Sequence, residues 1–312
     1  MDCVVTGGAG FIGSNLVDAL LARGDRVTVI DDLSSGKLEN LDSAIAAGVQ
    51  LHRLDVCDAA AVARVFTEVR PQLVFHLAAQ IDVRRSVEDP AFDAEVNVRG
   101  AINVLSAARE CGATRVVNTS TGGGLYGDAD LLPTPEGHPV HPLAPYGQSK
   151  YAAEGYFELY ASLYGLSTVS LRYGNVYGPR QDVHGEAGVV AIFCGCLVEG
   201  TTPHVFGDGR QTRDWVDVAD VVNANLLAAG SQVTGPFNIA GGEETSVLDL
   251  VQALGDVGAA QGLTFSAPEF LPARTGEVSR SRLDITRAAT ELGWRPTVGL
   301  RDGLERIVAG LL

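Results

Sequence analysis

The feature that most restricts how this chain can fold lies at its amino terminus, where the short run Val4-Val5-Thr6 leads straight into glycines spaced G-x-x-G-x-x-G. Gly7 permits a tight turn, Gly10 lets the backbone approach a pyrophosphate, and Gly13 lets the following helix pack closely on the strand. Anions are favoured at the N-terminus of such a helix. The pattern predicts a dinucleotide site, although the glycines alone are also compatible with a tight strand-to-helix turn that binds nothing.

The next apolar run, residues 27–30, fits a second parallel strand and ends in Asp31 and Asp32. An acid at this distance from the glycines can hold a ribose 2′-hydroxyl. Because a carboxylate repels a 2′-phosphate, and no arginine follows at once to receive one, the sequence predicts NAD rather than NADP as the cofactor.

The composition favours a small-molecule partner. A chain of 312 residues with 46% hydrophobic residues can fill a sizeable core, and its formal net charge of −15 would repel nucleic acid and anionic membrane surfaces. The cysteines contain no C-x-x-C pair, so neither a disulfide framework nor a metal site is indicated. Because the first residues already form a strand and no apolar run approaches membrane-spanning length, we expect a cytoplasmic protein.

Short apolar runs alternate with longer amphipathic ones up to about residue 175, which predicts an α/β fold with a doubly wound parallel Rossmann sheet. The predicted strands are 2–6, 26–30, 50–53, 72–76, 114–119 and 168–173, and the predicted helices are 11–23, 59–69, 96–111 and 146–164. Later, glycine and proline separate helical pieces such as 217–229 and 246–261. We therefore expect a dinucleotide-binding domain over residues 1–175, with returning segments from the C-terminal half, and a smaller substrate-binding lobe over residues 176–312.

Tyr146 and Lys150 form a candidate catalytic pair, because a spacing of four residues puts phenol and ammonium on one face of a helix. Thr121 follows the fifth predicted strand, at the edge where doubly wound sheets bind ligands. Lys150 and the cationic nicotinamide ring both favour the phenolate, so Tyr146 can take a proton from a substrate hydroxyl. Thr121 would hydrogen-bond the same oxygen. Taken alone, Thr121 could equally be a solvated loop hydroxyl, and Y-x-x-x-K can occur by chance.

Two other strand ends offer cofactor contacts. Asp55 can accept from an adenine amino group while Val56 packs on the ring; the alternative, capping of the next helix, suits Asp58 better. His76 is interpreted as a hydrogen-bonded core residue, and Asn97 is expected to tie adjacent backbone near the cofactor. Small residues after the fourth strand let the backbone run beside the phosphates and the nicotinamide ribose: Leu77, Ala78 and Ala79.

Five parts of the sequence together resemble the extended short-chain dehydrogenase/reductases, and within them the UDP-glucose (UDP-galactose) 4-epimerases. They are residues 6–14 (TGGAGFIGS), 76–80 (HLAAQ), Tyr146 with Lys150, 172–180 (RYGNVYGPR) and 207–216 (GDGRQTRDWV). The resemblance runs almost from end to end, and jointly these parts are specific for enzymes that act on sugar nucleotides.

The resemblance implies two sets of ligand contacts. Those to NAD are Gly7, Gly10, Phe11, Ile12, Gly13, Asp31, Asp32, Ser35, Gly36, Asp55, Val56, Leu77, Ala78, Ala79, Thr119, Tyr146, Lys150 and Tyr173. Those to a UDP-hexose are Thr121, Gly122, Gly123, Asn175, Val190, Val205, Phe206, Gln211, Arg213 and Arg274. Asn175 would lie near the sugar and the diphosphate, with Val205 and Phe206 near the uracil. Arg213 and Arg274 would contact the diphosphate, which a guanidinium binds in a bidentate manner.

The reaction that the resemblance implies is epimerisation at C4. The base takes the 4-hydroxyl proton, and C4 gives a hydride to NAD. The resulting 4-keto sugar rotates in the site, and the hydride returns to the opposite face of C4, without net redox change. Similar dehydratases and decarboxylases carry an acid directly after the serine or threonine of the site, where this chain has glycines at 122–124. We therefore expect epimerisation rather than 4,6-dehydration or decarboxylation.

Alternatives concern the substrate, the class of protein and the assembly. UDP-glucuronate is the closest rival substrate: Asp182 would repel its carboxylate, but Arg84 and Arg85 could compensate. By the same resemblance, the position that gates sugar size in the family corresponds to Ser281, whose small side chain suggests room for the N-acetyl group of UDP-GlcNAc. An oxidoreductase that releases NADH and a non-catalytic NAD-binding scaffold are the other classes. The helices 96–111 and 146–164 resemble those that pair across the family's dimer interface, so we expect a homodimer, or a monomer if both helices only cover the sheet.

Overall fold

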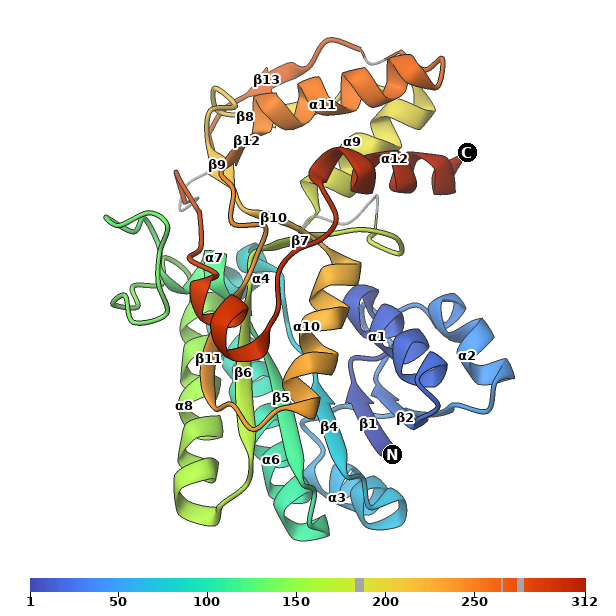
Figure 1. Ribbon diagram of the computed structural model, residues 1–312, viewed down its shortest axis with the longest axis vertical. Helices are drawn as coiled ribbons and strands as arrows, with labels where there is room; N and C mark the ends of the chain where they lie inside the picture. The colour runs from blue at the N-terminus through green and yellow to red at the C-terminus, as the bar shows by residue number, and fades with distance from the viewer. Residues whose placement is uncertain (183–187, 265, 274–277) are drawn as a thin grey trace.

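The computed structural model describes residues 1–182, 188–264, 266–273 and 278–312. Within them, seven parallel strands form the central sheet in the order β11-β6-β5-β4-β1-β2-β3 (Figure 1). Their bounds are β1 (Asp2–Thr6), β2 (Arg26–Asp31), β3 (Gln50–Arg53), β4 (Leu73–His76), β5 (Arg115–Thr121), β6 (Thr168–Tyr173) and β11 (Gly235–Ile239). The strand order reverses between β1 and β4, and sheets of this kind bind ligands outside the carboxyl ends of such strands.

All six strands predicted from the sequence are present, and the α/β Rossmann architecture is confirmed. β5 continues to Thr121, two residues beyond its predicted end, so Thr121 closes the strand instead of lying in the loop after it. The sequence pattern does not predict β11, which returns from the C-terminal half and pairs with β6. It contains Pro236 and lies at the edge of the sheet, where a residue without an N–H donor is tolerated.

Helices cover both faces of the sheet (Figure 1). Successive strand residues point to opposite faces, so Val5 joins the core beneath α1 and α10, while Val4 joins the core beneath α3, α6 and α8. The helices associated with the sheet are α1 (Phe11–Ala22), α2 (Asp42–Ala46), α3 (Ala59–Val69), α4 (Val83–Glu88), α5 (Pro90–Ala94), α6 (Gly100–Cys111), α7 (Gly122–Leu125), α8 (Pro145–Tyr164) and α10 (Val218–Gly230), with short 3₁₀ and π segments at η1 (Leu38–Leu41), η2 (Glu95–Arg99) and η3 (Ala288–Leu292).

The remaining elements lie beyond the carboxyl ends of the central strands, at the top of Figure 1. Their bounds are β7 (Asn175–Tyr177), α9 (Val189–Glu199), β8 (His204–Phe206), β9 (Thr212–Arg213), β10 (Trp215–Asp217), β12 (Thr245–Ser246), α11 (Val247–Ala260), β13 (Glu269–Leu271) and α12 (Leu300–Leu311). Three of these helices, α9, α11 and α12, enclose their own apolar core around Phe193, Leu254 and Leu304. The chain therefore builds a second packed layer directly above the edge where the sheet can bind ligands.

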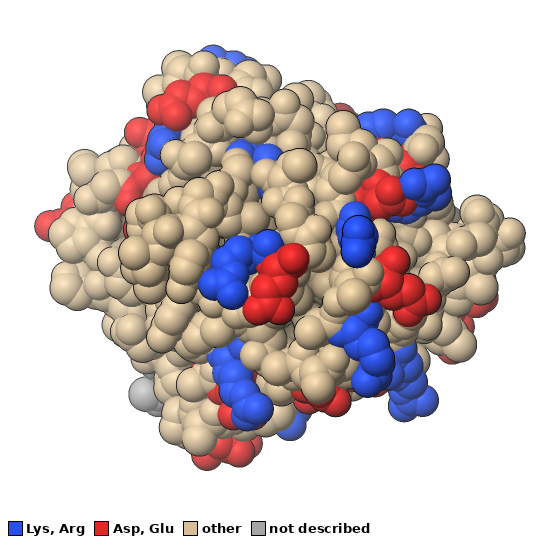
Figure 2. All heavy atoms as spheres, turned by 90° about the horizontal axis from the view of Figure 1, so that it is seen from below, with Lys and Arg blue, Asp and Glu red and all other residues tan. Residues whose placement is uncertain are grey.

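The lower face of the molecule carries basic and acidic side chains interspersed with much uncharged surface (Figure 2). A surface of mixed sign lacks the continuous positive field that phosphate backbones require. In the part of the chain that the structure describes, no helix is both long and apolar enough to cross a membrane.

Candidate active site

The glycine turn between β1 and α1 is packed too closely for side chains. Gly7 has a φ of +71°, and a Cβ there would lie 2.6 Å from the backbone nitrogen of Ala78, just after β4. A Cβ on Gly13 would lie 2.1 Å from the Gly7 carbonyl oxygen. Gly10 is the N-cap of α1, and none of the described side chains caps this helix end or puts an acid in its first turn. The first-turn amides are therefore available to an anion, as the glycine spacing predicts.

Asp31, the last residue of β2, faces the glycine turn, and the next residue, Asp32, is exposed to solvent. Asp31 is buried, and its carboxylate accepts from the backbone N–H of Ala9 and of Leu33, each at 2.9 Å. Burial raises the pKa of Asp31, and these two backbone hydrogen bonds oppose that shift. A Cβ on Gly36 would lie 2.8 Å from Asp31 Oδ1, so glycine at this position lets the loop pack closely against the carboxylate.

The other residues expected to contact the cofactor lie around this turn. Asp55 accepts from the N–H of Cys57 at 2.8 Å, while Asp58 caps α3 by accepting from Ala61, as expected. Half-buried positions are Phe11 and Ile12 in the first turn of α1, Gly36, and Leu77, Ala78 and Ala79 after β4; Val56 is buried and Ser35 is exposed. The hydroxyls of Thr119 and Tyr173 lie 3.3 Å apart on neighbouring strands β5 and β6.

His76 is a core residue, as its interpretation from the sequence requires. Its Nδ1 lies 2.8 Å from Thr6 Oγ1, and its ring stacks on Phe157. Complete burial lowers the pKa of His76 to about 3, with a smaller contribution from the charge of Lys150. A histidine in this state is neutral at physiological pH and has a fixed partner.

Thr121 and Tyr146 come together at the carboxyl end of β5, with Lys150 one turn further along the helix of Tyr146. Thr121 closes the strand and caps α7, its Oγ1 accepting from the Gly124 N–H at 3.1 Å. A Cβ on Gly124 would lie 3.3 Å from Thr121 Oγ1 and 3.5 Å from Tyr146 Cε1, so both side chains border the same small space. Tyr146 lies in the first turn of α8, and Lys150 follows one turn later with its side chain buried.

The low-dielectric surroundings shift the pKa values of both α8 groups. Burial raises the pKa of Tyr146 to about 12, against a hydrogen bond from Thr121 that lowers it. Burial lowers the pKa of Lys150 to about 8, against the negative charges of Glu154 and Asp93, which raise it. The protein alone thus keeps the phenol neutral, and a positive charge added beside it would favour the phenolate.

A buried polar network joins the loop after β4 to α8. Asn97 donates to the Gln80 carbonyl at 3.0 Å and to Ser149 Oγ at 3.0 Å, and it accepts from the Gln80 N–H at 2.9 Å. The expectation that Asn97 ties adjacent backbone is confirmed. It lies in the π-helical segment η2, a type of irregularity that is frequent at functional sites. Sequence reasoning missed Asp93, which accepts from both Gln80 and Asn97.

The residues expected at the sugar lie on the other side of Thr121. A Cβ on Gly123 would lie 3.7 Å from Asn175 Oδ1 and 3.9 Å from Ser281 Oγ, so these three positions surround one space. Ser281, predicted to gate sugar size, thus lies near Gly123 and Asn175, and its role stays a prediction. The space beside Gly122 is filled, because a Cβ there would lie 2.3 Å from Leu283 Cδ1.

The residues expected at the uridine diphosphate lie in the second lobe. Val205 and Phe206 form β8, Gln211 donates to the Phe206 carbonyl at 2.8 Å, and Val190 is buried in the first turn of α9. Arg213 donates to the carbonyls of Thr212 and Val278, each at 2.8 Å. Arg274 lies outside the described residues.

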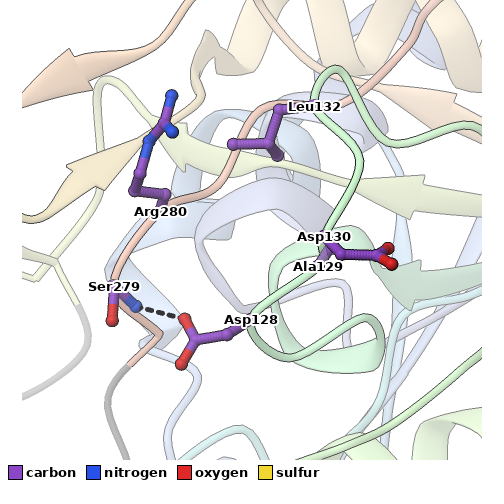
Figure 3. Close-up of a pocket in the computed structure, with 6 residues that line it drawn as sticks. All are labelled: Asp128, Ala129, Asp130, Leu132, Ser279 and Arg280. Atoms are coloured by element: carbon purple, nitrogen blue, oxygen red, sulfur yellow. Dashed lines mark hydrogen bonds between the residues drawn. The ribbon is translucent and has the colours of Figure 1, made fainter.

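A hollow of about 490 Å³ opens beside this end of the site (Figure 3). Asp128, Ala129, Asp130 and Leu132, from the segment after α7, face Ser279 and Arg280 across it. The Ser279 N–H donates to Asp128 Oδ1 at 2.6 Å, which links the two sides. The hollow is therefore on the Ser281 side of the site and not at the glycine turn.

Comparison with protein families gives a match over residues 4–307 to the family described as GDP-mannose 4,6 dehydratase. The chain belongs to this family. Membership in the GDP-mannose 4,6 dehydratase family confirms the resemblance to extended short-chain dehydrogenase/reductases, because the match includes the glycine turn, the Tyr146–Lys150 pair and nearly all of the second lobe.

Several similar proteins of this fold are UDP-glucose 4-epimerases. The enzyme of Mycolicibacterium smegmatis is 49% identical over 311 residues, which are 99% of this chain and 97% of that protein. The solved structure of the Thermotoga maritima enzyme with UDP-glucose has a TM-score of 0.95 and 44% identity, covering 100% of this chain and 98% of that one. The Thermus thermophilus enzyme, solved with NAD, has a TM-score of 0.91 and 43% identity, covering 99% and 98%.

Proposed function

We propose that the protein is an NAD-dependent UDP-glucose 4-epimerase. The observation that carries the proposal is the meeting of Thr121 and Tyr146 at the end of β5, with the buried Lys150 one helical turn after Tyr146 and glycine instead of an acid after Thr121. One base and one hydroxyl donor are sufficient for reversible oxidation at C4. Similarity to UDP-glucose 4-epimerases over nearly the whole chain supports the same function.

Each of the three side chains has one task. The Tyr146 oxygen takes the proton of the C4 hydroxyl and returns it after the 4-keto sugar has rotated in the site. Lys150 favours the phenolate through its positive charge and holds the nicotinamide ribose. Because Thr121 Oγ1 already accepts from the Gly124 N–H, its own proton is directed toward the substrate oxygen or Tyr146, and it positions that oxygen. When bound, NAD supplies the reversible acceptance of a hydride from C4.

The residues around β1 and β2 fit NAD. The uncapped first turn of α1 suits a pyrophosphate, and the close packing of Gly7 and Gly13 leaves that turn free of side chains. The Asp31 carboxylate retains lone pairs for ribose hydroxyls and would repel a 2′-phosphate. The remaining proposed contacts are Gly10, Phe11, Ile12, Asp32, Ser35, Gly36, Asp55, Val56, Leu77, Ala78, Ala79, Thr119 and Tyr173.

The substrate spans the two lobes in this proposal. The uracil packs near Val205 and Phe206, Arg213 and Arg274 hold the diphosphate, and the hexose lies near Gly123 and Asn175. Further contacts are proposed for Gly122, Val190 and Gln211. Residues 1–175, with the returning segments, serve as the NAD-binding domain, and residues 176–312 serve mainly as the UDP-sugar lobe. Because the uridine diphosphate stays firmly bound, the 4-keto sugar can rotate beside the small residues of the pocket without leaving the enzyme.

We also propose a homodimer in the cytoplasm. α8 exposes five large apolar or aromatic side chains although it contacts the sheet and α6 with its other face: Tyr151, Tyr156, Leu159, Leu163 and Tyr164. Burial of this face against a second copy would remove the apolar area from water. Light scattering on the purified protein distinguishes the dimer from a monomer in which α6 and α8 only cover the sheet.

The function is tested by incubating the purified protein with UDP-glucose, UDP-galactose, UDP-GlcNAc and UDP-glucuronate separately and following the anomeric proton signals by NMR. A 4-epimerase converts UDP-glucose and UDP-galactose into the same equilibrium mixture. Steady accumulation of NADH absorbance would instead indicate an oxidoreductase. Protein that carries no nicotinamide, or that leaves every UDP-sugar unchanged at C4, would refute the proposal.

A further inference from the structure

Among the buried charged residues around Tyr146, Asp93 has no role in the function proposed above. Lys150 is 3% exposed, Glu154 2% and Asp93 1%. A buried charge is stable only when an opposite charge or several hydrogen bonds compensate it. Glu154 already has such a partner, because Arg172 on β6 donates to both of its oxygens at distances from 2.6 to 3.1 Å. Glu154 still raises the pKa of Lys150 more than any other acid does, but because it shares its charge with Arg172, a second acid is needed to balance the ammonium.

Asp93 is that group by position and by its unused oxygen. Its Oδ1 accepts from Gln80 Nε2 at 2.9 Å and from Asn97 Nδ2 at 3.2 Å, both neutral donors. Its Oδ2 is buried and accepts no hydrogen bond from any described residue. Asn97 also donates to Ser149, the neighbour of Lys150, so two hydrogen bonds connect Asp93 to the helix that carries the ammonium.

We propose that Asp93 is a positioning residue for the proposed epimerase chemistry: its buried carboxylate balances the charge of Lys150 and keeps the ammonium protonated beside Tyr146. The two groups form no direct ion pair among the described contacts, and their attraction acts through the low-dielectric interior. Glu154 and, to a smaller extent, Asp93 raise the pKa of Lys150, in agreement with a shared role. The inference rests on the proposed function only for its kinetic consequence.

Other charged groups near the pair are accounted for. His76 is neutral, because its burial lowers its pKa to about 3. Arg85 stacks on the Phe92 ring. Charged or titratable groups on the elements packed around the pair include Tyr146 and Glu154 on α8, His76 on β4, Arg172 on β6, Asp82, Arg84, Arg85 and Glu88 on α4 and its cap, Asp89 at the start of α5, and Glu95 and Arg99 on η2.

Asp93→Asn tests the charge without breaking the network. The amide oxygen can take both hydrogen bonds of Oδ1, and the amide nitrogen replaces an oxygen that accepts none. In the holoenzyme we expect the alkaline limb of the kcat profile to move about one pH unit downward. KM for UDP-galactose should change less than about twofold, because the substitution removes no contact with the bound substrate. Glu95→Gln is the matched control: it removes an exposed charge from the adjoining segment and should leave the profile unchanged.

A stability cycle tests the same charge balance without any turnover. Lys150→Met should lower the melting temperature by roughly 5–10 °C, because it leaves Asp93 uncompensated. Adding Asp93→Asn to that variant should restore several degrees. A double variant whose loss equals the sum of the single losses, or an unchanged alkaline limb in a well-folded Asp93→Asn, overturns the proposal. If no UDP-sugar is epimerised, the proposed function fails, while the melting cycle still decides the role of Asp93.

Discussion

Replacing Tyr146 by phenylalanine removes one hydroxyl from the centre of the site and leaves the ring in place. The ring is packed beside Gly124 and Thr121, and phenylalanine fills the same volume. The lost hydrogen bond with Thr121 should change the free energy of unfolding by about 1 kcal/mol. Bound NAD should be retained, because its main contacts are proposed at the glycine turn and Asp31. The effect is therefore expected in catalysis and not in folding.

The size of the effect follows from the ionisation of the phenol. With a pKa of about 12, only about one Tyr146 side chain in 10⁴ is a phenolate at pH 8. This pKa belongs to the protein with Lys150 in place, so the positive nicotinamide ring has to lower it for the wild type to work near neutral pH. A phenylalanine has no ionisable group, so it loses the whole contribution of general base catalysis, about 10²- to 10⁴-fold in kcat.

The assay is conversion of UDP-galactose followed by the anomeric proton signals, together with the NAD released when the protein is denatured. Tyr151→Phe is the matched control, because it removes a hydroxyl from the exposed side of the same helix. We expect the control to retain wild-type turnover and Tyr146→Phe to lose at least about 100-fold with normal NAD content. A Tyr146→Phe variant that keeps more than about a tenth of the activity would refute the assignment of the base.

Three further predictions concern packing, specificity and pH. Gly13→Ala should yield little folded protein containing NAD, because its Cβ would lie 2.1 Å from the Gly7 carbonyl oxygen, whereas Gly155→Ala, with nothing within 4 Å, should behave as wild type in NAD content and melting temperature. Ser281→Tyr should lower turnover of UDP-GlcNAc relative to UDP-galactose. If the wild type and Ser281→Tyr show the same ratio of the two turnover rates, position 281 does not control the size of the sugar. Burial raises the pKa of Asp214 to about 7, so the folded state holds this proton more tightly, and the free energy of unfolding should fall, by up to about 4 kcal/mol, as the pH rises from about 4 to about 7. Asp214→Asn should flatten that slope in urea titrations at several pH values.

The central sheet was predictable because its information is local. Most of its first six strands contain a short apolar run, the glycine turn follows β1 directly, and Asp31 closes β2. The three proposed catalytic residues could be predicted for the same reason. Tyr146 and Lys150 share one helical face, and Thr121 closes a strand at the edge of the sheet where ligands bind.

Features that depend on contacts between distant segments were not predictable. β11 has no strong apolar pattern of its own and becomes part of the sheet only by pairing with β6. Asp214 looks like one more surface acid in the sequence, yet it is buried and accepts from the N–H groups of Gly242 and Leu283, which tie three segments together. Asp93 is hidden in the same way, because its partners come from the loop after β4 and from η2.

The register of the sheet explains why groups from two elements can meet so closely. β5 and β6 pair with Ser120 opposite Arg172, one residue before Thr121 reaches the site. Arg172 holds Glu154 on α8 through its buried ion pair, and Glu154 follows Lys150 by one helical turn. The strand that ends in the hydroxyl and the helix that carries the phenol and the ammonium are thus fixed to each other through the neighbouring strand. A misplacement of about 1 Å can cost about 10²-fold in rate. The reaction therefore depends on the Arg172–Glu154 ion pair, although neither residue touches the substrate.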